Sequence, residues 1–186
     1  YCRIFDKYYY LNEGYGLKGF RYDVNELLYI VSEIDLKHIV LTGGEPTIQE
    51  DILELVQELT NAGYIVTMET NAKKYHDVYK FVDFLIVNIK TYSAGRPYTD
   101  LKIIHQILET CNWVSFTCLI DDKKDFDYLL DKFDKQSVWC FLKDDNIDYE
   151  EYIDYFLINN NLRMCIKYDT LLRLDWENNY KRLKGD

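Results

Sequence analysis

The chain has 186 residues, which suits a single domain, and we expect one domain over residues 1–186. Its hydrophobic fraction of 48% and charged fraction of 29% are typical of a soluble globular protein, and no apolar run approaches the roughly 20 residues of a transmembrane helix, so we expect no membrane partner. The formal net charge of −10 argues against nucleic acid as a partner, because phosphate binding needs a basic face.

The first half of the chain is predicted to begin with a loop and then to alternate between helices and strands. Residues 1–22 are aromatic, contain glycines and lack periodicity, which predicts a long loop. The predicted elements that follow are a helix capped by Asp23 with Glu26 in a capping box, a strand at Ile39–Leu41, a helix from Glu50 or Asp51 to Leu59, a stop at Asn61–Gly63, a strand at Tyr64–Met68, a short helix at Tyr75–Phe81 and a strand at Phe84–Ile89.

The second half continues the alternation. Its predicted elements are a turn-rich loop at Thr91–Pro97, a helix from Asp100 to Leu108, a strand at Trp113–Ile120, a helix at Asp125–Phe133, a strand at Val138–Leu142, a helix at Asp148–Ile158, a strand at Leu162–Ile166 and a tail over residues 168–186. Strands that alternate with helices predict a parallel sheet, here over a core at residues 23–167. About six strands are fewer than the eight of a closed barrel, so we expect a partial (β/α) barrel. A doubly wound open sheet fits this alternation nearly as well.

The strand at Ile39–Leu41 leads into a motif that suits ligand binding. The motif reads Thr42, Gly43, Gly44, Glu45, Pro46. Glycines let a ligand approach the backbone closely, and ligands of α/β folds bind at the carboxyl ends of strands. A carboxylate beside bare glycine backbone suits a ligand with an ammonium group. The alternative is an ordinary turn between a strand and a helix, where Gly and Pro are common.

Polar residues also end the next two predicted strands, and parallel strands place all three ends at one edge of the sheet. Glu69 could bind an amine or a guanidine-like edge, while Thr70 and Asn71 could bind ribose hydroxyls or carboxylates. Lys90, which follows Asn88, could meet a ligand carboxylate. Each of these residues could instead be an ordinary surface or turn residue. Weaker candidates in the following loop are Ser93 and Arg96.

The Gly-Gly-Glu-Pro motif with Gln49 resembles the motif of radical S-adenosylmethionine enzymes. Glu69-Thr70-Asn71 resembles the Glu-Thr-Asn-Gly motif of one family in that superfamily, 7-carboxy-7-deazaguanine synthase. Val87–Lys90 followed by Ser93-Ala94-Gly95 is similar to a later strand and serine-rich loop of that family. The resemblance covers roughly residues 23–96. It implies that S-adenosylmethionine and a 4Fe–4S cluster are the cofactors.

The resemblance also implies roles for individual residues. Those expected at the amino group of S-adenosylmethionine are Gly43, Gly44, Glu45 and Pro46, and those expected near its ribose and carboxylate are Thr70 and Asn71. Those expected around the substrate are Gln49, Glu69, Lys90 and Ser93. The resemblance names no catalytic side chain beyond these binding residues.

The chain has five cysteines but no C-x-x-C spacing, which argues against a zinc ribbon or a thioredoxin motif. Cys118, Cys140 and Cys165 lie in or beside apolar runs and are expected to be buried thiols, and reduced cysteines favour the cytoplasm. The superfamily holds its cluster with three cysteines, and Cys2 fits the last of them if the other two lie upstream of Tyr1. The alternative is that Cys2 is an incidental thiol.

Three positions depart from the family pattern. Arg3-Ile4 stands where the family has Asp-Thr, so the sequence gives a magnesium site little support. Ala72 replaces the glycine after Asn71, and no histidine lies near Asp169. These departures concern the substrate and the metal more than the superfamily.

The resemblance implies reductive cleavage of S-adenosylmethionine to a 5′-deoxyadenosyl radical that abstracts a substrate hydrogen. The expected reaction converts 6-carboxy-tetrahydropterin into 7-carboxy-7-deazaguanine, with a flavodoxin or ferredoxin-type electron donor, and a homodimer is compatible with it. One alternative is an activase that makes a glycyl radical in a partner, as for anaerobic ribonucleotide reductase. Another is a non-catalytic barrel that binds a small molecule or a partner, which is favoured if Tyr1 is the true N-terminus.

Overall fold

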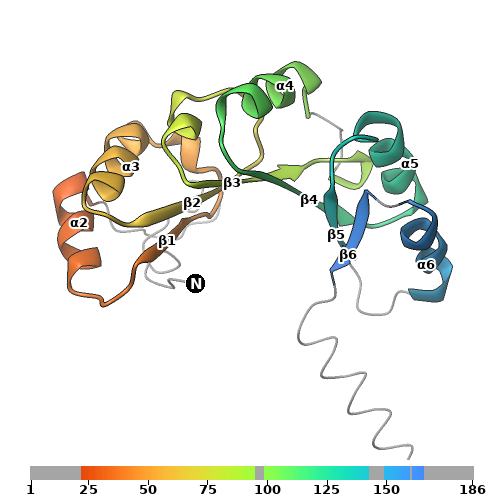
Figure 1. The fold of residues 1–186 in the computed structure, drawn as a ribbon, viewed down its shortest axis with the longest axis horizontal. Coiled ribbons are helices and arrows are strands. Elements are labelled where there is room, and N and C mark those ends of the chain that lie inside the picture. Colours follow the sequence, from red (N-terminus) through yellow and green to blue (C-terminus); the bar gives the residue numbers. More distant parts are fainter. Residues whose placement is uncertain (1–21, 95–98, 143–148, 160, 166–186) are drawn as a thin grey trace, which may run out of the picture. The chain divides into compact units, whose positions relative to one another are not determined.

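The computed structural model describes residues 22–94, 99–142, 149–159 and 161–165. Their six strands form one open sheet in chain order, β1-β2-β3-β4-β5-β6 (Figure 1). The strands are β1 (His38–Leu41), β2 (Ile65–Thr70), β3 (Phe84–Ile89), β4 (Val114–Ile120), β5 (Val138–Leu142) and β6 (Leu162–Cys165). The pairs β1–β2, β2–β3, β4–β5 and β5–β6 are parallel. The predicted parallel sheet of about six strands is confirmed.

Helices connect these strands, as the alternation in the sequence predicts. The α-helices are α2 (Val24–Ser32), α3 (Ile52–Asn61), α4 (Leu101–Thr110), α5 (Lys123–Lys132) and α6 (Tyr149–Ile158). Short 3₁₀ helices are η2 (Pro46–Ile48), η3 (Asp77–Lys80) and η4 (Tyr92–Ala94). None of the described helices is long and apolar enough to cross a membrane.

The predicted capping box at the start of α2 is present. The Asp23 carboxylate accepts a hydrogen bond from the Glu26 N–H, and the Glu26 carboxylate accepts one from the Asp23 N–H, each at 2.9 Å. This reciprocal pair satisfies two N–H groups at the helix start. The predicted stop of α3 is also observed, because Gly63 adopts a positive φ of 84° that favours glycine.

Several observed boundaries differ from the predicted ones by one or two residues, and three of the differences have a physical reason. Strand β2 reaches Thr70, because β-ladder pairing with β3 continues to Thr70↔Val87, beyond the predicted end at Met68. Helix α5 begins at Lys123 rather than Asp125, because Asp122 and Asp125 form a capping box and Asp125 is its third helical residue. The segment predicted as a helix at Tyr75–Phe81 is only the 3₁₀ helix η3, which the His76 ring caps by accepting from the Val78 N–H.

The described residues group into two compact units. The first contains the chain up to Asn88 together with Thr99–Ser115, and the second contains the remainder from Ile89. The first unit buries Val56, Leu59, Val66, Met68, Tyr79 and Leu85, and the second buries Phe126, Leu129, Phe133, Val138 and Cys140. Whether the whole chain behaves as one domain stays a prediction. Of its three predicted parts, the loop up to residue 21 and the tail lie outside the described residues.

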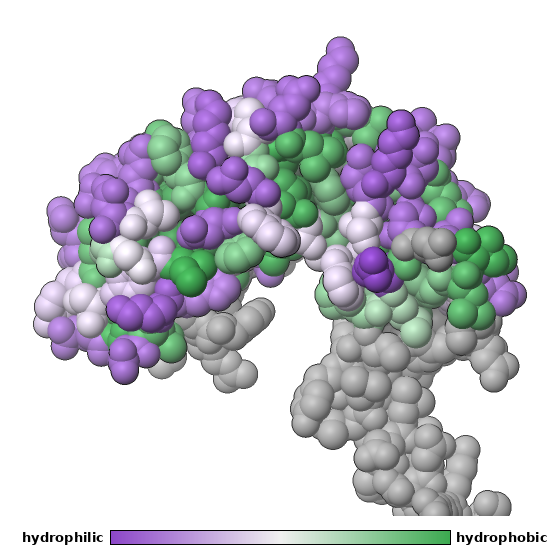
Figure 2. Space-filling model, viewed as in Figure 1, coloured by the Kyte–Doolittle hydropathy of each residue, from purple (hydrophilic) through white to green (hydrophobic). Residues whose placement is uncertain are grey.

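Within the first unit, α2, α3 and α4 lie on one face of the strands (Figure 1). Ile39 and Leu41 of β1 point to that face and are each 2% exposed. The outward sides of the helices are mainly hydrophilic (Figure 2). Because side chains alternate across a strand, the neighbouring residues of β1 point to the other face, away from the helices.

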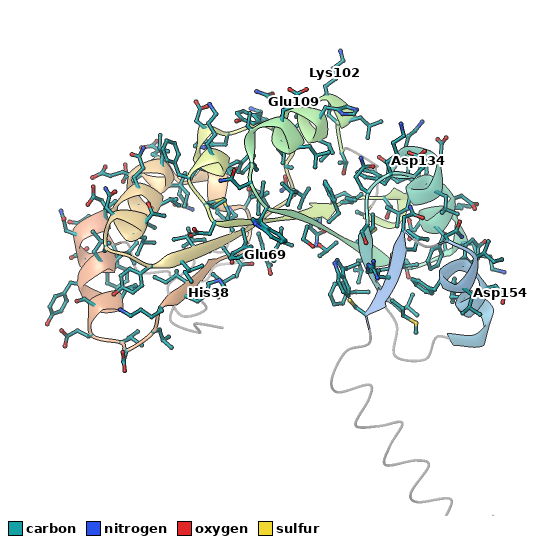
Figure 3. All side chains as sticks on the ribbon, in the orientation of Figure 1. His38, Glu69, Lys102, Glu109, Asp134 and Asp154 are labelled. Atoms are coloured by element: carbon teal, nitrogen blue, oxygen red, sulfur yellow. The ribbon has the colours of Figure 1, made fainter. Side chains whose placement is uncertain are left out.

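The face of these strands that none of the described helices covers carries several polar side chains. Figure 3 shows Glu69 and His38 on the side of the sheet away from Lys102 and Glu109 of α4. His38 is the first residue of β1, and its Nε2 is 2.7 Å from the hydroxyl of Thr67. Glu69 lies near the carboxyl end of β2, so this end of the first unit is the candidate site.

Candidate functional site

Glu45 is the centre of a hydrogen-bond network that joins the loops after β1 and β2. Its Oε1 accepts from the Thr47 hydroxyl at 2.8 Å, the Thr47 N–H at 3.3 Å and the Thr70 hydroxyl at 2.7 Å. Its Oε2 accepts from the Asn71 N–H at 2.8 Å. Thr70 and Asn71, which follow Glu45 by 25 and 26 positions, thus hold its carboxylate in a fixed orientation. The sequence prediction that the ends of β1 and β2 converge is confirmed at this point.

The two oxygens of Glu45 are used unequally. A carboxylate can accept about four hydrogen bonds, about two on each oxygen. Oε1 is saturated by three donors, whereas among the described residues only the Asn71 N–H reaches Oε2. The remaining capacity for a ligand donor is therefore on Oε2.

The two glycines of the motif, Gly43 and Gly44, differ in their backbone conformation and in the space around them. Gly43 has a φ of 129°, which side chains other than glycine adopt only with strain. Gly44 does not have a positive φ, and a Cβ built on it would meet no atom of the other described residues within 4 Å, its two chain neighbours aside. The described fold therefore requires glycine at position 43, whereas position 44 leaves open space beside the backbone, next to Glu45.

Glu69 is held on the face of the sheet opposite α2, α3 and α4. Its Oε2 accepts from the Thr42 hydroxyl at 2.7 Å, and this contact is partly buried. Thr42 directly follows Leu41, whose partner in the ladder is Met68, so the strand pairing itself brings Thr42 beside Glu69. Glu69 in turn pairs with Ile86 of β3, an apolar neighbour on the same face. Within residues 22–94, the Thr42 hydroxyl is the donor found on this carboxylate, so its other oxygen can accept from a ligand.

The residues after β2 form a tight turn. The Thr70 hydroxyl accepts from the Ala72 N–H at 3.0 Å, and the Asn71 side-chain oxygen accepts from the Lys73 N–H at 2.9 Å. Ala72 is fully buried with a φ of 47°, in the left-handed region. The family's glycine at this position therefore matches the backbone that the structure shows, and Ala72 holds the same conformation at a steric cost of about 1 kcal/mol.

The other predicted site residues are placed as follows. Pro46 is buried at the start of η2, and Gln49 is exposed at its end. Lys90 directly follows β3 but belongs to the second compact unit, so its approach to Glu69 stays a prediction. Ser93 lies in η4, and its side chain is outside the described part, as are Arg96 and Cys2.

The described cysteines are separate thiols rather than parts of a metal-binding cluster. Burial raises the pKa of Cys118 to about 12 and also raises the pKa values of Cys140, Cys165 and Cys111. No three His, Cys, Asp or Glu residues within the described ranges are grouped to hold a metal ion. The predicted buried thiols Cys118 and Cys140 are confirmed, while Cys165 is only partly buried.

Sequence analysis missed Thr47 and Tyr79. Thr47 gives two hydrogen bonds to Glu45, and the Tyr79 hydroxyl lies 3.0 Å from the Thr70 hydroxyl. Burial raises the pKa of Tyr79 to about 12, and the charge of Glu45 adds to that shift while the Thr70 contact opposes it. A hydroxyl residue two positions after Glu45 was a usable signal for Thr47. The contact of Tyr79 depends on tertiary packing and has no signal in the sequence.

Comparison with curated proteins supports the family suggested by the motifs. The 7-carboxy-7-deazaguanine synthase of Rhodopirellula baltica is 45% identical over 53 residues, covering 28% of this chain and 21% of the relative. That of Haemophilus influenzae is 39% identical over 109 residues, covering 55% and 49%. A putative glycyl-radical enzyme activating enzyme of Methanocaldococcus jannaschii is 30% identical over 82 residues, covering 41% and 32%. The matches thus span about half the length of these relatives or less. No protein-family model matches the chain.

Solved structures support the fold. QueE of Escherichia coli superposes with a TM-score of 0.59 at 19% identity, covering 77% of this chain and 62% of that one. SuiB of Streptococcus suis, solved with S-adenosylmethionine bound, superposes with a TM-score of 0.51 at 16% identity, covering 70% and 39%. At these identities the likeness concerns the fold alone.

The fold is therefore a partial (β/α) barrel, as the sequence predicts, and it resembles that of QueE and SuiB. In sequence, the chain is similar to 7-carboxy-7-deazaguanine synthases from several organisms. The resemblance drawn from Gly-Gly-Glu-Pro and Glu-Thr-Asn is thus confirmed.

Proposed function

We propose that this chain forms the barrel of a radical S-adenosylmethionine enzyme, and that the enzyme acts as a 7-carboxy-7-deazaguanine synthase. The observation that carries the proposal is the fixed Glu45 carboxylate beside the open backbone of Gly44. When bound, S-adenosylmethionine and a 4Fe–4S cluster supply the one-electron chemistry that begins hydrogen abstraction from the substrate. The residues of the chain would bind and orient these groups.

The motif fits the amino group of S-adenosylmethionine. An ammonium group donates and cannot accept, so it needs acceptors. The unsaturated Oε2 of Glu45 is such an acceptor, and its negative charge strengthens the bond. The open space at Gly44 leaves room for the ligand beside the backbone. Thr70 and Asn71 would act chiefly by holding Glu45, which adds to their expected place near the ribose and carboxylate.

Glu69 suits the substrate. A pterin presents N–H groups along one edge, and a carboxylate with one oxygen held by Thr42 can accept from that edge with the other. Gln49, Lys90 and Ser93 complete the proposed substrate residues on the evidence of their motif positions. The cluster would be bound through Cys2 and two further cysteines. No feature of the described residues bears on magnesium, the electron donor or a homodimer.

The experiment for this function is product formation. The protein with its natural N-terminal region is loaded with iron and sulfide under anaerobic conditions and incubated with S-adenosylmethionine, a reductant and 6-carboxy-tetrahydropterin. We expect 7-carboxy-7-deazaguanine by mass spectrometry, and none when S-adenosylmethionine is omitted. Protein that carries its cluster and cleaves S-adenosylmethionine but gives no such product would exclude this substrate.

The two glycines give a matched pair of variants. Gly44→Ala places a methyl group in open space, so the protein should keep its stability while S-adenosylmethionine binding falls roughly 10-fold or more, equivalent to about 1.4 kcal/mol. Gly43→Ala strains a backbone with a φ of 129° and should lower the free energy of unfolding by about 1 kcal/mol or more. Thermal unfolding and calorimetric titration measure the two effects. Equal ligand affinity for Gly44→Ala and the parent would argue against a ligand at this turn.

The second candidate is an activase that generates a glycyl radical in a partner protein. The similarity to a putative glycyl-radical activating enzyme favours it, although that match covers 41% of this chain. This function predicts a stable complex with a large partner enzyme. A pull-down from the native organism that recovers no such enzyme would weigh against it.

A further inference from the structure

Behind Glu45 lies a chain of two buried hydroxyl groups, of which the proposed function uses Thr70 but not Tyr79. The Tyr79 hydroxyl is 3.0 Å from the Thr70 hydroxyl, which is 2.7 Å from Oε1 of Glu45. Tyr79 is fully buried and Thr70 is 3% exposed. Tyr79 comes from η3, outside the strands and loops of the motif, so a separate element supports the carboxylate.

The direction of the hydrogen bonds follows from counting protons. An ionised carboxylate only accepts, so the single hydroxyl proton of Thr70 goes to Glu45. The Thr70 oxygen also accepts from the Ala72 N–H at 3.0 Å, and one lone pair remains. Thr70 thus has no proton left for Tyr79, so Tyr79 is the donor in this pair, and its one proton is shared between the Thr70 oxygen at 3.0 Å and the Lys74 carbonyl at 3.3 Å. Hydrogen bonds in such a chain polarise and strengthen one another.

We propose that Tyr79 is a positioning residue, which through Thr70 fixes the Glu45 carboxylate for the amino group of S-adenosylmethionine. This inference rests on the proposed function and adds a residue that no motif of the chain contains. Tyr79 touches no ligand in this account. Its hydroxyl keeps the Thr70 proton on Oε1, so that Oε2, which accepts from the Asn71 N–H, keeps capacity for the amino group.

The test compares Tyr79→Phe with Tyr75→Phe by titration with two ligands. Tyr75 is the matched control, because its hydroxyl donates to Thr110 at 3.2 Å in an exposed contact away from Glu45. The ligands are S-adenosylmethionine and 5′-methylthioadenosine, which lacks the amino acid part. We expect Tyr79→Phe to weaken S-adenosylmethionine binding roughly 3- to 10-fold, the contribution of one hydrogen bond, and to leave 5′-methylthioadenosine unchanged. Tyr75→Phe should change neither affinity.

A second pair keeps the test decisive if Tyr79→Phe folds poorly. Thr70→Ser retains the hydroxyl and should bind like the parent, whereas Thr70→Val removes it and should weaken S-adenosylmethionine selectively. The inference is overturned if Tyr79→Phe and Thr70→Val bind S-adenosylmethionine like the parent, or if both ligands weaken equally. A parent protein that binds no S-adenosylmethionine would overturn the proposed function itself, which is a distinct result.

Discussion

Glu45→Gln is expected to weaken S-adenosylmethionine binding roughly 10- to 100-fold. A hydrogen bond to a charged group contributes about 1.5–3 kcal/mol, and the variant loses the charge that faces the ammonium group. The amide of glutamine also brings a donor toward the Asn71 N–H, the Thr47 hydroxyl or the Thr70 hydroxyl, which are donors themselves. Calorimetric titration of the folded variant measures the loss.

Glu58→Gln is the control for this variant. Glu58 lies on the exposed side of α3, and its substitution removes the same charge far from the proposed ligand. The control should bind like the parent. If Glu45→Gln keeps its fold and also binds like the parent, Glu45 has only the structural role of joining the loops after β1 and β2.

Cys2→Ser is expected to remove most of the iron from protein that carries its natural N-terminal region. A serine hydroxyl is a poor replacement for a thiolate ligand of an iron–sulfur cluster. Cys165→Ser is the matched control, because Cys165 is partly buried at the end of β6 and burial raises its pKa. Iron and sulfide analysis after anaerobic reconstitution measures both variants. Full iron content in Cys2→Ser would show that Cys2 is an incidental thiol.

The fold could be predicted from the sequence because its signals are local. Helix caps such as Asp23 with Glu26 involve residues three positions apart, and the apolar stripe of α3 repeats with the helical period. Strand pairing in chain order follows from the alternation of strands and helices. The end of β2 was predicted too early, because Glu69 and Thr70 are polar but still pair with β3.

The candidate site was predicted only in part. Gly-Gly-Glu-Pro and Glu-Thr-Asn locate Glu45, Glu69 and Thr70 at the ends of adjacent strands, and the structure brings these ends together. Their pattern does not reveal that Thr70 and Asn71 donate to Glu45, because such contacts depend on side-chain orientation across two loops. The role of Tyr79 is harder to foresee, since a buried tyrosine in a tyrosine-rich chain usually indicates packing.

The backbone conformation of glycine and alanine positions is likewise not evident from the sequence. The sequence alone does not distinguish Gly43, which the backbone requires, from Gly44, which leaves open space. Ala72 appears in the sequence as a departure from the family, whereas the structure shows it in the left-handed conformation that a glycine would adopt without strain. A departure in residue type can therefore preserve the backbone of a site.

The most direct test of the central claim is the formation of 5′-deoxyadenosine from S-adenosylmethionine. Protein with its natural N-terminal region, loaded with about four irons per chain, is reduced and incubated with S-adenosylmethionine and 6-carboxy-tetrahydropterin. The account predicts 5′-deoxyadenosine from the parent protein and a large loss of it in Glu45→Gln. Iron-loaded, reduced protein that forms no 5′-deoxyadenosine would contradict the assignment as a radical S-adenosylmethionine enzyme.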